Sequence, residues 1–429
     1  MERAAVRVPG VGLALLALAG CEPAVNITIR PSDWVPSAFR AEWDGPAGRA
    51  TLWVADGAAD AADDETEWRV LTAQEVEAGR AGLPIALLPV GRDYSVRVEL
   101  ESEGAEAIMS EAATVTMPAA PDVLGFPQIE FVDEARSELA AGGYSLVNRY
   151  AGAASASEAI EFILDGQGEV VWWMAPQPTG HRVVRGKLSR DLRSALILEG
   201  ESGEGDDYIN RVALDGESSV DTIAPGANHD FHENGDGTLT WLAYERAEAG
   251  TIPDIPYPVV ADALVTGVEG ATDASQHRTG FSFLDDFPAE PEILCEHQEL
   301  GEFITGAVEW THANSVVRTP TDDGFLVMTR SLDALLMIDD SGRRVWQLGG
   351  REATLTPTAP EALFQHAHMS DAWQDDEGAL RVLIFDNGNH RPEPITSRVI
   401  ELRPEGDEVW RLQSEERLGR VVWVPSLGI

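Results

Sequence analysis

A strand, a turn and a second strand that closes on tryptophan recur along this chain. The units span 164–172, 338–346 and 402–410, and each carries Asp or Gly in its turn. Repeated hairpins of this kind are typical of β-propeller blades, in which each blade buries its aromatic side chain against the next. Helical periodicity is almost absent, with one candidate short helix near 258–265. An all-β fold with a β-propeller from about Phe126 onward is therefore predicted, and a large sandwich or a solenoid is the alternative.

The residues before the predicted propeller show a different sequence pattern. Short segments alternate apolar and polar residues and are separated by Pro, Gly and Asp turns, which predicts a small β-sandwich. A loop ending at Tyr94 is similar to the tyrosine corner of immunoglobulin-like folds, so this region resembles fibronectin type III modules in pattern. The expected strands are 26–30, 38–43, 49–54 and 95–100, and the expected linker is 117–121. The predicted organisation is a leader at 1–20, a β-sandwich at 21–117 and a propeller at 122–429.

The first residues predict the compartment. Arg3 and Arg7 precede an apolar run at 11–19, which is too short to span a membrane and is followed by Leu-Ala-Gly and Cys21. This arrangement is typical of a lipoprotein signal peptide, after which Cys21 carries the lipid. We therefore expect a protein of the periplasm or cell surface that is lipid-anchored to a membrane. The alternative is a buried N-terminal helix that happens to end in cysteine.

Charge and cysteine content restrict the partners and the means of stabilisation. Lys and Arg total 31 against 73 Asp and Glu, a formal charge of −42, and such a surface repels nucleic acid. With Cys21 lipidated, Cys295 has no cysteine left to pair with in the same chain, so the fold must depend on its core. An anionic substrate would need local positive charge, which makes the few arginines near histidines informative.

Histidine is scarce but clustered in three similar frames. The chain has nine histidines, and four of them are His229 before Asp-Phe, His312 within the run 310–316, and His366 and His368 within 364–368. Arg330 follows the second frame. Neutral imidazole is a good nucleophile near pH 7, so these frames indicate group-transfer chemistry.

The frames, taken together, resemble the bacterial arylsulfate sulfotransferases. Three blocks match that family in order: His229-Asp230-Phe231 with Asp236-Gly237; Trp310-x-His312-x-Asn314-Ser315-Val316 with Asp323-Gly324, Thr329-Arg330 and Ile338-Asp339; and Gln365-His366 with 385–388 and Ser397-Arg398. The resemblance implies a six-bladed propeller, here either complete or short of its last blade. It also implies transfer of a sulfuryl group from an aryl sulfate donor to a phenolic acceptor, with no nucleotide cofactor and no metal.

The same resemblance implies roles for individual residues. His366 would be the nucleophile that becomes sulfated, while His229, His312 and Arg330 would bind the sulfate oxygens. Asn314 would orient a ring or an oxygen through its amide. His368 is the alternative nucleophile, because a spacing of two residues predicts that it shares a strand face with His366.

Two other functions stay open at this point. A lipid-anchored propeller without catalytic activity could bind a ligand or partner through the same face. A metalloenzyme is the third reading, since His229 with His232, or His366 with His368, could supply imidazole ligands. The natural donor and acceptor and the oligomeric state are not predicted.

Replacing Cys21 by Ser tests the lipid anchor. We expect the variant to move from the membrane fraction to the soluble fraction, because the thioether that carries the lipid cannot form on serine. Fractionation of cells followed by immunoblotting measures this, and membrane association that is unchanged in the variant would exclude lipidation at Cys21.

Overall fold

The structure is a computed structural model that describes residues 25–59, 67–121, 143–149, 160–175, 182–200, 207–286, 306–357, 363–389, 397–404 and 409–417. The predicted leader, Cys21 and Cys295 lie outside the described residues, as does the start of the predicted propeller at 122. Contacts divide the chain into two compact units. The first unit contains Arg40–Ile85 and Arg92–Thr116, and the second contains Pro31–Phe39, Ala86–Gly91 and the chain from Met117 onward.

The predicted all-β class is confirmed. Apart from a 3₁₀ residue at Ala59, helix in the described ranges is limited to the 3₁₀ turn η4 (Ala274–Gln276) and the single turn α2 (Phe283–Asp286). No helix there is long and apolar enough to cross a membrane. The helix predicted near 258–265 is wrong, because these residues form strand β18 (Val259–Val268). Its first six residues are all buried, and β-branched residues that are buried on both faces of a sheet favour a strand. A short, continuous apolar run does not distinguish a helix from a buried strand in the sequence.

The first unit is a β-sandwich of two sheets. Buried residues alternate along its central strands, as Ala50, Leu52 and Val54 do in β3. The four strands expected from the sequence coincide with β1, β2, β3 and β6. One sheet orders β1 (Thr28–Pro31), β2 (Phe39–Gly45) and β5 (Gly79–Ile85); the other orders β4 (Arg69–Val76), β3 (Gly48–Asp56), β6 (Asp93–Glu101) and β7 (Ile108–Met109), with β8 (Ala113–Thr116) also on β6.

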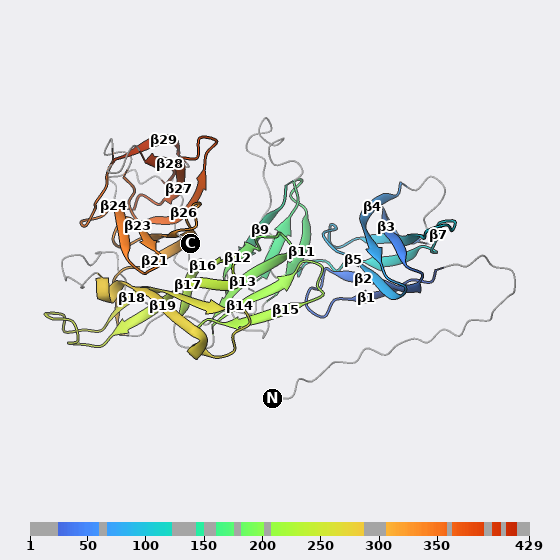
Figure 1. Ribbon diagram of the computed structural model, residues 1–429, viewed down its shortest axis with the longest axis horizontal. Helices are drawn as coiled ribbons and strands as arrows, with labels where there is room; N and C mark the ends of the chain where they lie inside the picture. The colour runs from blue at the N-terminus through green and yellow to red at the C-terminus, as the bar shows by residue number, and fades with distance from the viewer. Residues whose placement is uncertain are drawn as a thin grey trace. The chain divides into compact units, whose positions relative to one another are not determined.

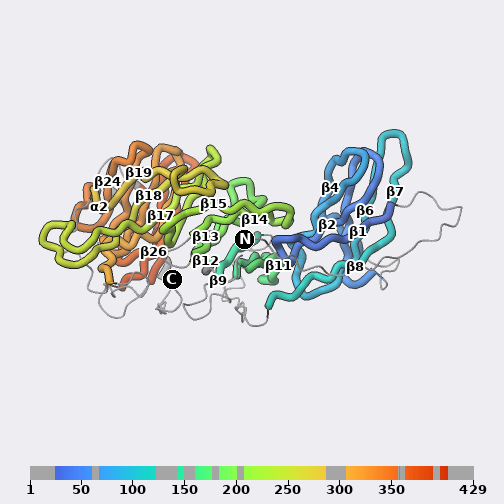
Figure 2. Tube along the Cα trace, turned by 90° about the horizontal axis from the view of Figure 1, so that it is seen from below, coloured from blue at the N-terminus to red at the C-terminus, as the bar shows by residue number. Residues whose placement is uncertain are grey.

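The described residues of the second unit form five successive sheets, which can be followed in chain order from green to red in Figure 1 and Figure 2. The three hairpins that close on tryptophan are confirmed as β10–β11, β23–β24 and β28–β29. The sheets are β9 (Ser145–Arg149), β10 (Ile160–Leu164) and β11 (Val170–Met174); β12 (Arg182–Leu188), β13 (Ser194–Gly200), β14 (Tyr208–Ala213) and β15 (Ser219–Ile223); β16 (Ala227–Glu233), β17 (Thr238–Ala247), β18 and β19 (His277–Ser282), with β20 (Val308–Glu309) on β18; β21 (Ala313–Arg318), β22 (Gly324–Thr329), β23 (Ala334–Asp339) and β24 (Arg344–Gly349); and β26 (Ala367–Gln374), β27 (Leu380–Asp386), β28 (Arg398–Pro404), β29 (Val409–Arg417) and β25 (Thr356–Pro357).

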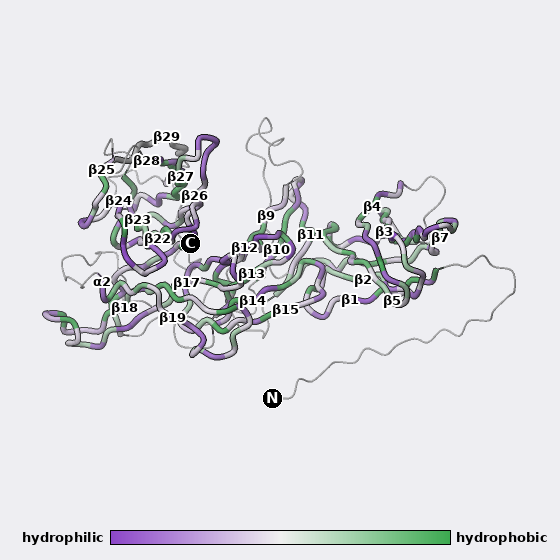
Figure 3. Tube along the Cα trace, viewed as in Figure 1, coloured by the Kyte–Doolittle hydropathy of each residue, from purple (hydrophilic) through white to green (hydrophobic). Residues whose placement is uncertain are grey.

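These sheets pack as propeller blades do. The first strands β9, β12, β16, β21 and β26 adjoin one another in this order. Apolar side chains fill the space between neighbouring sheets; Leu196, Leu198 and Ile209 of one sheet, for example, pack with Phe231 and Trp241 of the next. Hydrophobic and hydrophilic stretches alternate along the trace in Figure 3. The first strands therefore lie side by side in chain order, and β12 and β26 approach each other across a common space, which is called the centre below. Closure into a ring of six blades stays a prediction.

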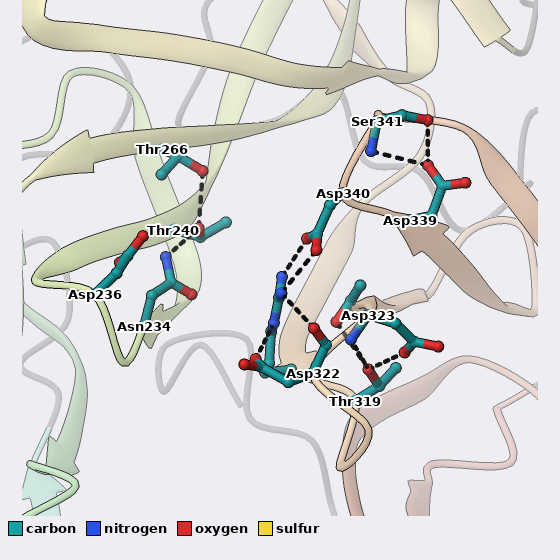
Figure 4. Close-up of polar contacts among 12 residues, drawn as sticks. Asn234, Asp236, Thr240, Thr266, Thr319, Asp322, Asp323, Asp339, Asp340 and Ser341 are labelled. Atoms are coloured by element: carbon teal, nitrogen blue, oxygen red, sulfur yellow. Dashed lines mark hydrogen bonds and ion pairs between the residues drawn. The ribbon is translucent and has the colours of Figure 1, made fainter.

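Aspartate side chains close the hairpin turns. Oδ1 of Asp339 accepts the backbone N–H groups of Ser341 and Arg343, each at 3.0 Å, and Figure 4 shows Asp339 and Ser341 together. Gly342 in the same turn has φ 78°, a left-handed conformation that glycine adopts without strain. The same arrangement recurs at Asp165 with Gly168 and at Asp375 with Gly378. Local turn chemistry thus explains why these hairpins could be recognised in the sequence.

A carboxyl group is buried between the first two sheets of the second unit. Glu161 of β10 is 1% exposed, and a Cβ atom at Gly186 of β12 would overlap its carboxyl group. Burial is the largest influence on Glu161 and raises its pKa to about 8, although Arg185 opposes the shift. Glu161 is therefore mostly protonated at neutral pH.

Replacing Glu161 by Gln should flatten the pH dependence of stability. Because the folded-state pKa lies above the ordinary value of 4.5, the folded protein binds one more proton than the unfolded chain between these two pKa values. The contribution of Glu161 to stability is thus present at low pH and is lost as pH rises towards 8. Urea denaturation from about pH 5 to about pH 9 should show wild type losing at least about 1 kcal/mol more than Glu161→Gln. Parallel profiles for the two proteins would contradict this.

Candidate active site

Three of the framed histidines share a left-handed backbone conformation. φ is 49° at His229, 47° at His312 and 51° at His366. Each lies near the start of the first strand of a sheet, and each of those strands carries a β-bulge beside the histidine. Residues other than glycine rarely adopt this conformation, and such strain with bulges is concentrated at functional sites, where it redirects side chains.

Imidazole rings from three different sheets meet at the centre. The rings of His229 and His312 are 4.6 Å apart between centroids and pack edge to face. The ring of His368 is 6.3 Å from that of His229. The three side chains are partly exposed, so a small molecule in the centre could reach them.

Arg330 lies directly after β22, beside this cluster. Its backbone N–H donates to the carbonyl oxygen of His312 at 2.9 Å, which fixes the start of its side chain next to that histidine. Burial is the main cause of the lowered pKa values of His229 and His368, and the charge of Arg330 acts in the same direction. Among the described residues, no hydrogen bond or ion pair involves its guanidinium. A planar cation with its donors unused is suited to bind an anionic group.

His312 is held by a carboxylate. Oε2 of Glu309 lies 2.7 Å from Nδ1 of His312. Burial alone would raise the pKa of Glu309, but the neighbouring His312, His229 and Arg330 lower it to about 2. Glu309 is therefore ionised, and it accepts a hydrogen bond from Nδ1–H of His312 in the way that a carboxylate orients histidine in catalytic triads.

A second carboxyl group holds the segments around His229 and His312. Oδ2 of Asp262 on β18 accepts the Thr311 hydroxyl and the Ala313 N–H, each at 2.6 Å. Its Oδ1 accepts the Asn228 amide at 3.3 Å, and the amide oxygen of Asn228 is 3.1 Å from Nδ1 of His229. Burial raises the pKa of Asp262 to about 6. One side chain thus supports the strained backbone before β21 and, through Asn228, the ring of His229.

His229 and His368 are neutral at physiological pH. Burial, assisted by the charges of His312 and Arg330, lowers the pKa of His229 to about 3. Burial also lowers the pKa of His368 well below 6.5, and His229, His312 and Arg330 act in the same direction. Nδ1 of His368 is buried with no hydrogen-bond partner among the described residues. His368 is therefore an uncharged imidazole next to cationic groups, which is the state that a nucleophile requires.

The expectation that His366 and His368 share a strand face fails. His366 precedes β26 and is fully buried, with its backbone N–H donating to Oδ1 of Asp333 at 2.6 Å. The bulge between Ala367 and Met369 interrupts the two-residue period of the strand. The structure thus brings His368 to the cluster of His229 and His312 and encloses His366 in the protein.

Asn314 contacts the next sheet. Its Nδ2 donates to the carbonyl oxygen of Ala367 at 3.0 Å, between the two candidate nucleophiles. Its Oδ1 is buried and has no hydrogen-bond partner in the described part of the chain. Asn314 therefore positions the strand that carries His368, and its expected contact with a substrate stays a prediction.

A third buried carboxylate joins three first strands. Asp230 of β16 is 2.8 Å from Nζ of Lys187 on β12, and its Oδ2 accepts the N–H of Val316 on β21 at 2.9 Å. The Lys187 ammonium also donates to the Phe231 carbonyl oxygen at 2.6 Å. Arg185 of β12 lies 3.5 Å from Asp230 Oδ1.

Several of these residues were missed in the sequence. Glu309 could have been found, because it stands three residues before His312 in the second frame. Lys187 also leaves a signal, since it is the only lysine of the chain. Asp262 and Asp230 gave no usable signal, because their partners are far away in sequence. Within the described ranges, no group of three or more His, Cys, Asp or Glu residues is arranged to hold a metal ion.

The sequence matches one protein family. The model of the arylsulfotransferase (ASST) family matches residues 129–403, a span that includes all four framed histidines and Arg330. No curated protein matches the chain.

Solved structures show weak likeness. A structural genomics protein of unknown function from Bacteroides thetaiotaomicron VPI-5482 is 11% identical, with 89% of this chain and 85% of that chain covered and a TM-score of 0.33. An auxiliary nutrient binding protein from the same organism is 8% identical, with 90% and 84% covered and a TM-score of 0.34. The fn3 domain of human collagen alpha-1(XX) chain is 19% identical, with 27% and 100% covered and a TM-score of 0.19. Likeness at these TM-scores carries no argument about function.

Replacing Asp230 by Asn should destabilise the second unit strongly. The change leaves the partly buried Lys187 without its counter-charge, and breaking a buried ion pair on one side costs about 2–4 kcal/mol. Urea denaturation measures the loss. Asp340→Asn is the matched control, because Asp340 pairs with Arg318 at the surface and its loss should cost less than about 1 kcal/mol. Equal losses for the two variants would contradict a central role for Asp230.

Proposed function

This chain belongs to the arylsulfotransferase (ASST) family, and we propose that it transfers a sulfuryl group from an aryl sulfate to a phenolic acceptor through a covalent sulfohistidine. The observation that carries the proposal is the grouping of His229, His312, His368 and Arg330, in which neutral imidazoles lie beside a guanidinium without a described partner. Sulfuryl transfer resembles phosphoryl transfer in that charge accumulates on peripheral oxygens, so cationic and N–H donors perform most of the catalysis.

We assign the nucleophile to His368. Its ring is in the cluster and is kept neutral by burial and by neighbouring positive charge. His366, the nucleophile expected from the family frame, is fully buried. His366 remains the alternative nucleophile, and the experiment described below distinguishes it from His368.

The first half-reaction forms a bond between sulfur and nitrogen. A ring nitrogen of His368 attacks the sulfur of the donor, the bond between sulfur and the aryl oxygen breaks, and the phenolate leaves. The sulfated ring then loses the proton of its other nitrogen, and this proton ends on the departing phenolate. Arg330 and His229 stabilise the sulfuryl oxygens throughout.

The second half-reaction reverses these steps with a new phenol. The acceptor oxygen attacks sulfur, the bond between sulfur and nitrogen breaks, and the phenolic proton returns to the imidazole. His312, with its Nδ1–H held by ionised Glu309, is placed to accept and return that proton. The resulting cycle is of the ping-pong type.

We also propose that the protein works outside the inner membrane, attached through lipid on Cys21. The leader-like sequence before Cys21 supports this location. Transfer from an aryl sulfate to a phenol needs no nucleotide, so the reaction is compatible with a location outside the inner membrane.

Replacing His368 by Ala should abolish formation of the sulfo-enzyme. We expect the protein incubated with nitrophenyl sulfate alone to gain the mass of one sulfuryl group in wild type and not in the variant. Release of nitrophenol with a phenol acceptor should fall by about 1,000-fold or more, because removal of a nucleophile eliminates the covalent route. Intact-protein mass spectrometry and absorbance measure the two effects.

His366→Ala is the matched control for that experiment. It should retain the mass gain if His368 is the nucleophile, and peptide mapping of the wild-type adduct identifies the modified ring. An adduct on His366 would keep the mechanism and overturn the assignment. Absence of any adduct in wild type with a panel of aryl sulfates would instead support a binding module without catalytic activity.

A further inference from the structure

Arg185 reaches across the centre of the second unit. It lies on β12, and its Nη1 is 3.3 Å from the sulfur of Met369 on β26. These strands belong to sheets that are separated along the chain by the sheets of β16 and β21. Met369 directly follows His368, so Arg185 extends from the second sheet to the strand of the proposed nucleophile.

Most of the donors of Arg185 are available. A thioether sulfur is only a weak acceptor. Nε of Arg185 is buried without a hydrogen-bond partner among the described residues. The nearest carboxylate, Asp230, is 3.5 Å away and already interacts with Lys187 and the Val316 N–H. The guanidinium is therefore held in place but retains N–H groups for another acceptor.

The bulge in β26 brings His368 and Met369 towards the same region. The register shifts between Ala367 and Met369, so His368 is the extra residue, and residues at a bulge can project to one side of a strand. The lowered pKa of His368 is due mainly to burial, and the charges of Arg330 and Arg185 add to it. Two guanidinium groups from different sheets thus act on one imidazole.

The charge of the whole chain makes this pair significant. With a formal charge of −42, the protein repels an aryl sulfate anion at long range. Arg185 and Lys187 share the single carboxylate of Asp230, at 3.5 Å and 2.8 Å, and Arg330 is close to ionised Glu309. Two cations of β12 thus face one carboxylate, which leaves one positive charge in excess within this group. A locally positive centre in an acidic protein favours a bound anion.

We propose that Arg185 is a further ligand of the transferred sulfuryl group, and that with Arg330 it forms a two-arginine clamp around the sulfur attached to His368. This proposal rests on the proposed sulfotransferase function. The clamp would bind peripheral sulfuryl oxygens with N–H donors from two directions, and it would stabilise them most when charge accumulates there in the transition state.

The test uses the full-length protein with Arg185→Met and Arg185→Lys. We expect Arg185→Met to weaken the binding of inorganic sulfate, measured by calorimetry, and to slow sulfo-enzyme formation from nitrophenyl sulfate in a single turnover, each by about 10- to 100-fold. Arg185→Lys keeps a charge opposite Asp230 but loses the planar fork, so it should fold like wild type and still be slower by about 10-fold. If Arg185→Met does not fold, the sulfate affinity and rate of Arg185→Lys decide whether Arg185 binds the sulfuryl group.

Arg381→Met is the control, because Arg381 is a similarly buried arginine that pairs with Asp375 and Glu401 away from the histidines. Its sulfate affinity and rate should match those of wild type. Values for folded Arg185 variants within about twofold of wild type would overturn the clamp and leave the sulfotransferase proposal intact. If wild type binds sulfate through Arg185 but never forms an adduct, the anion site stands and the sulfotransferase proposal fails. If wild type does neither, both are overturned.

Discussion

The central arrangement depends on the carboxylate of Asp230, which is 1% exposed. From β16 it forms an ion pair with Lys187 of β12 and accepts the backbone N–H of Val316 on β21. Apolar packing holds neighbouring sheets together but is tolerant of small rotations. A carboxylate between charged and backbone donors is directional, and it is costly to separate from them when buried. Asp230 thus fixes how three first strands are aligned. The positions of His229 and His312 depend on that alignment, because β16 carries His229 and β21 directly follows His312.

Backbone strain is the second element of the site, and other aspartates support it. His229, His312 and His366 have left-handed φ values, and such residues persist only where their surroundings hold them. Asp262 accepts the Ala313 N–H next to His312, and Asp333 accepts the N–H of His366. At these positions, side-chain carboxylates accept backbone N–H groups that a regular strand would have paired with a neighbouring strand, and the left-handed histidines depend on them.

Local features of this protein were predictable, and features that depend on distant residues were not. The hairpins ending at Trp172 and Trp346 follow from turn chemistry written into a few adjacent residues. The convergence of His229 and His312 was expected from frames repeated at the starts of strands. The different placement of His366 and His368 was not, because one bulged residue in β26 breaks the period on which the sequence argument relied. Arg185 and Lys187 were missed because their partners lie on other sheets.

The chain has a single lysine, and it lies at the centre with a quarter of its side chain accessible. Burial lowers the pKa of Lys187, so more of it is in the unprotonated form that reacts with electrophiles, despite the opposing charge of Asp230. Reagents that acylate amines usually decorate the outside of a protein at many positions. Here they find one side-chain amine, which pairs with Asp230, the residue after His229. Acylation of the lysine side chain therefore measures how freely small molecules reach the interior of the second unit, once the reaction of any free α-amino group is subtracted.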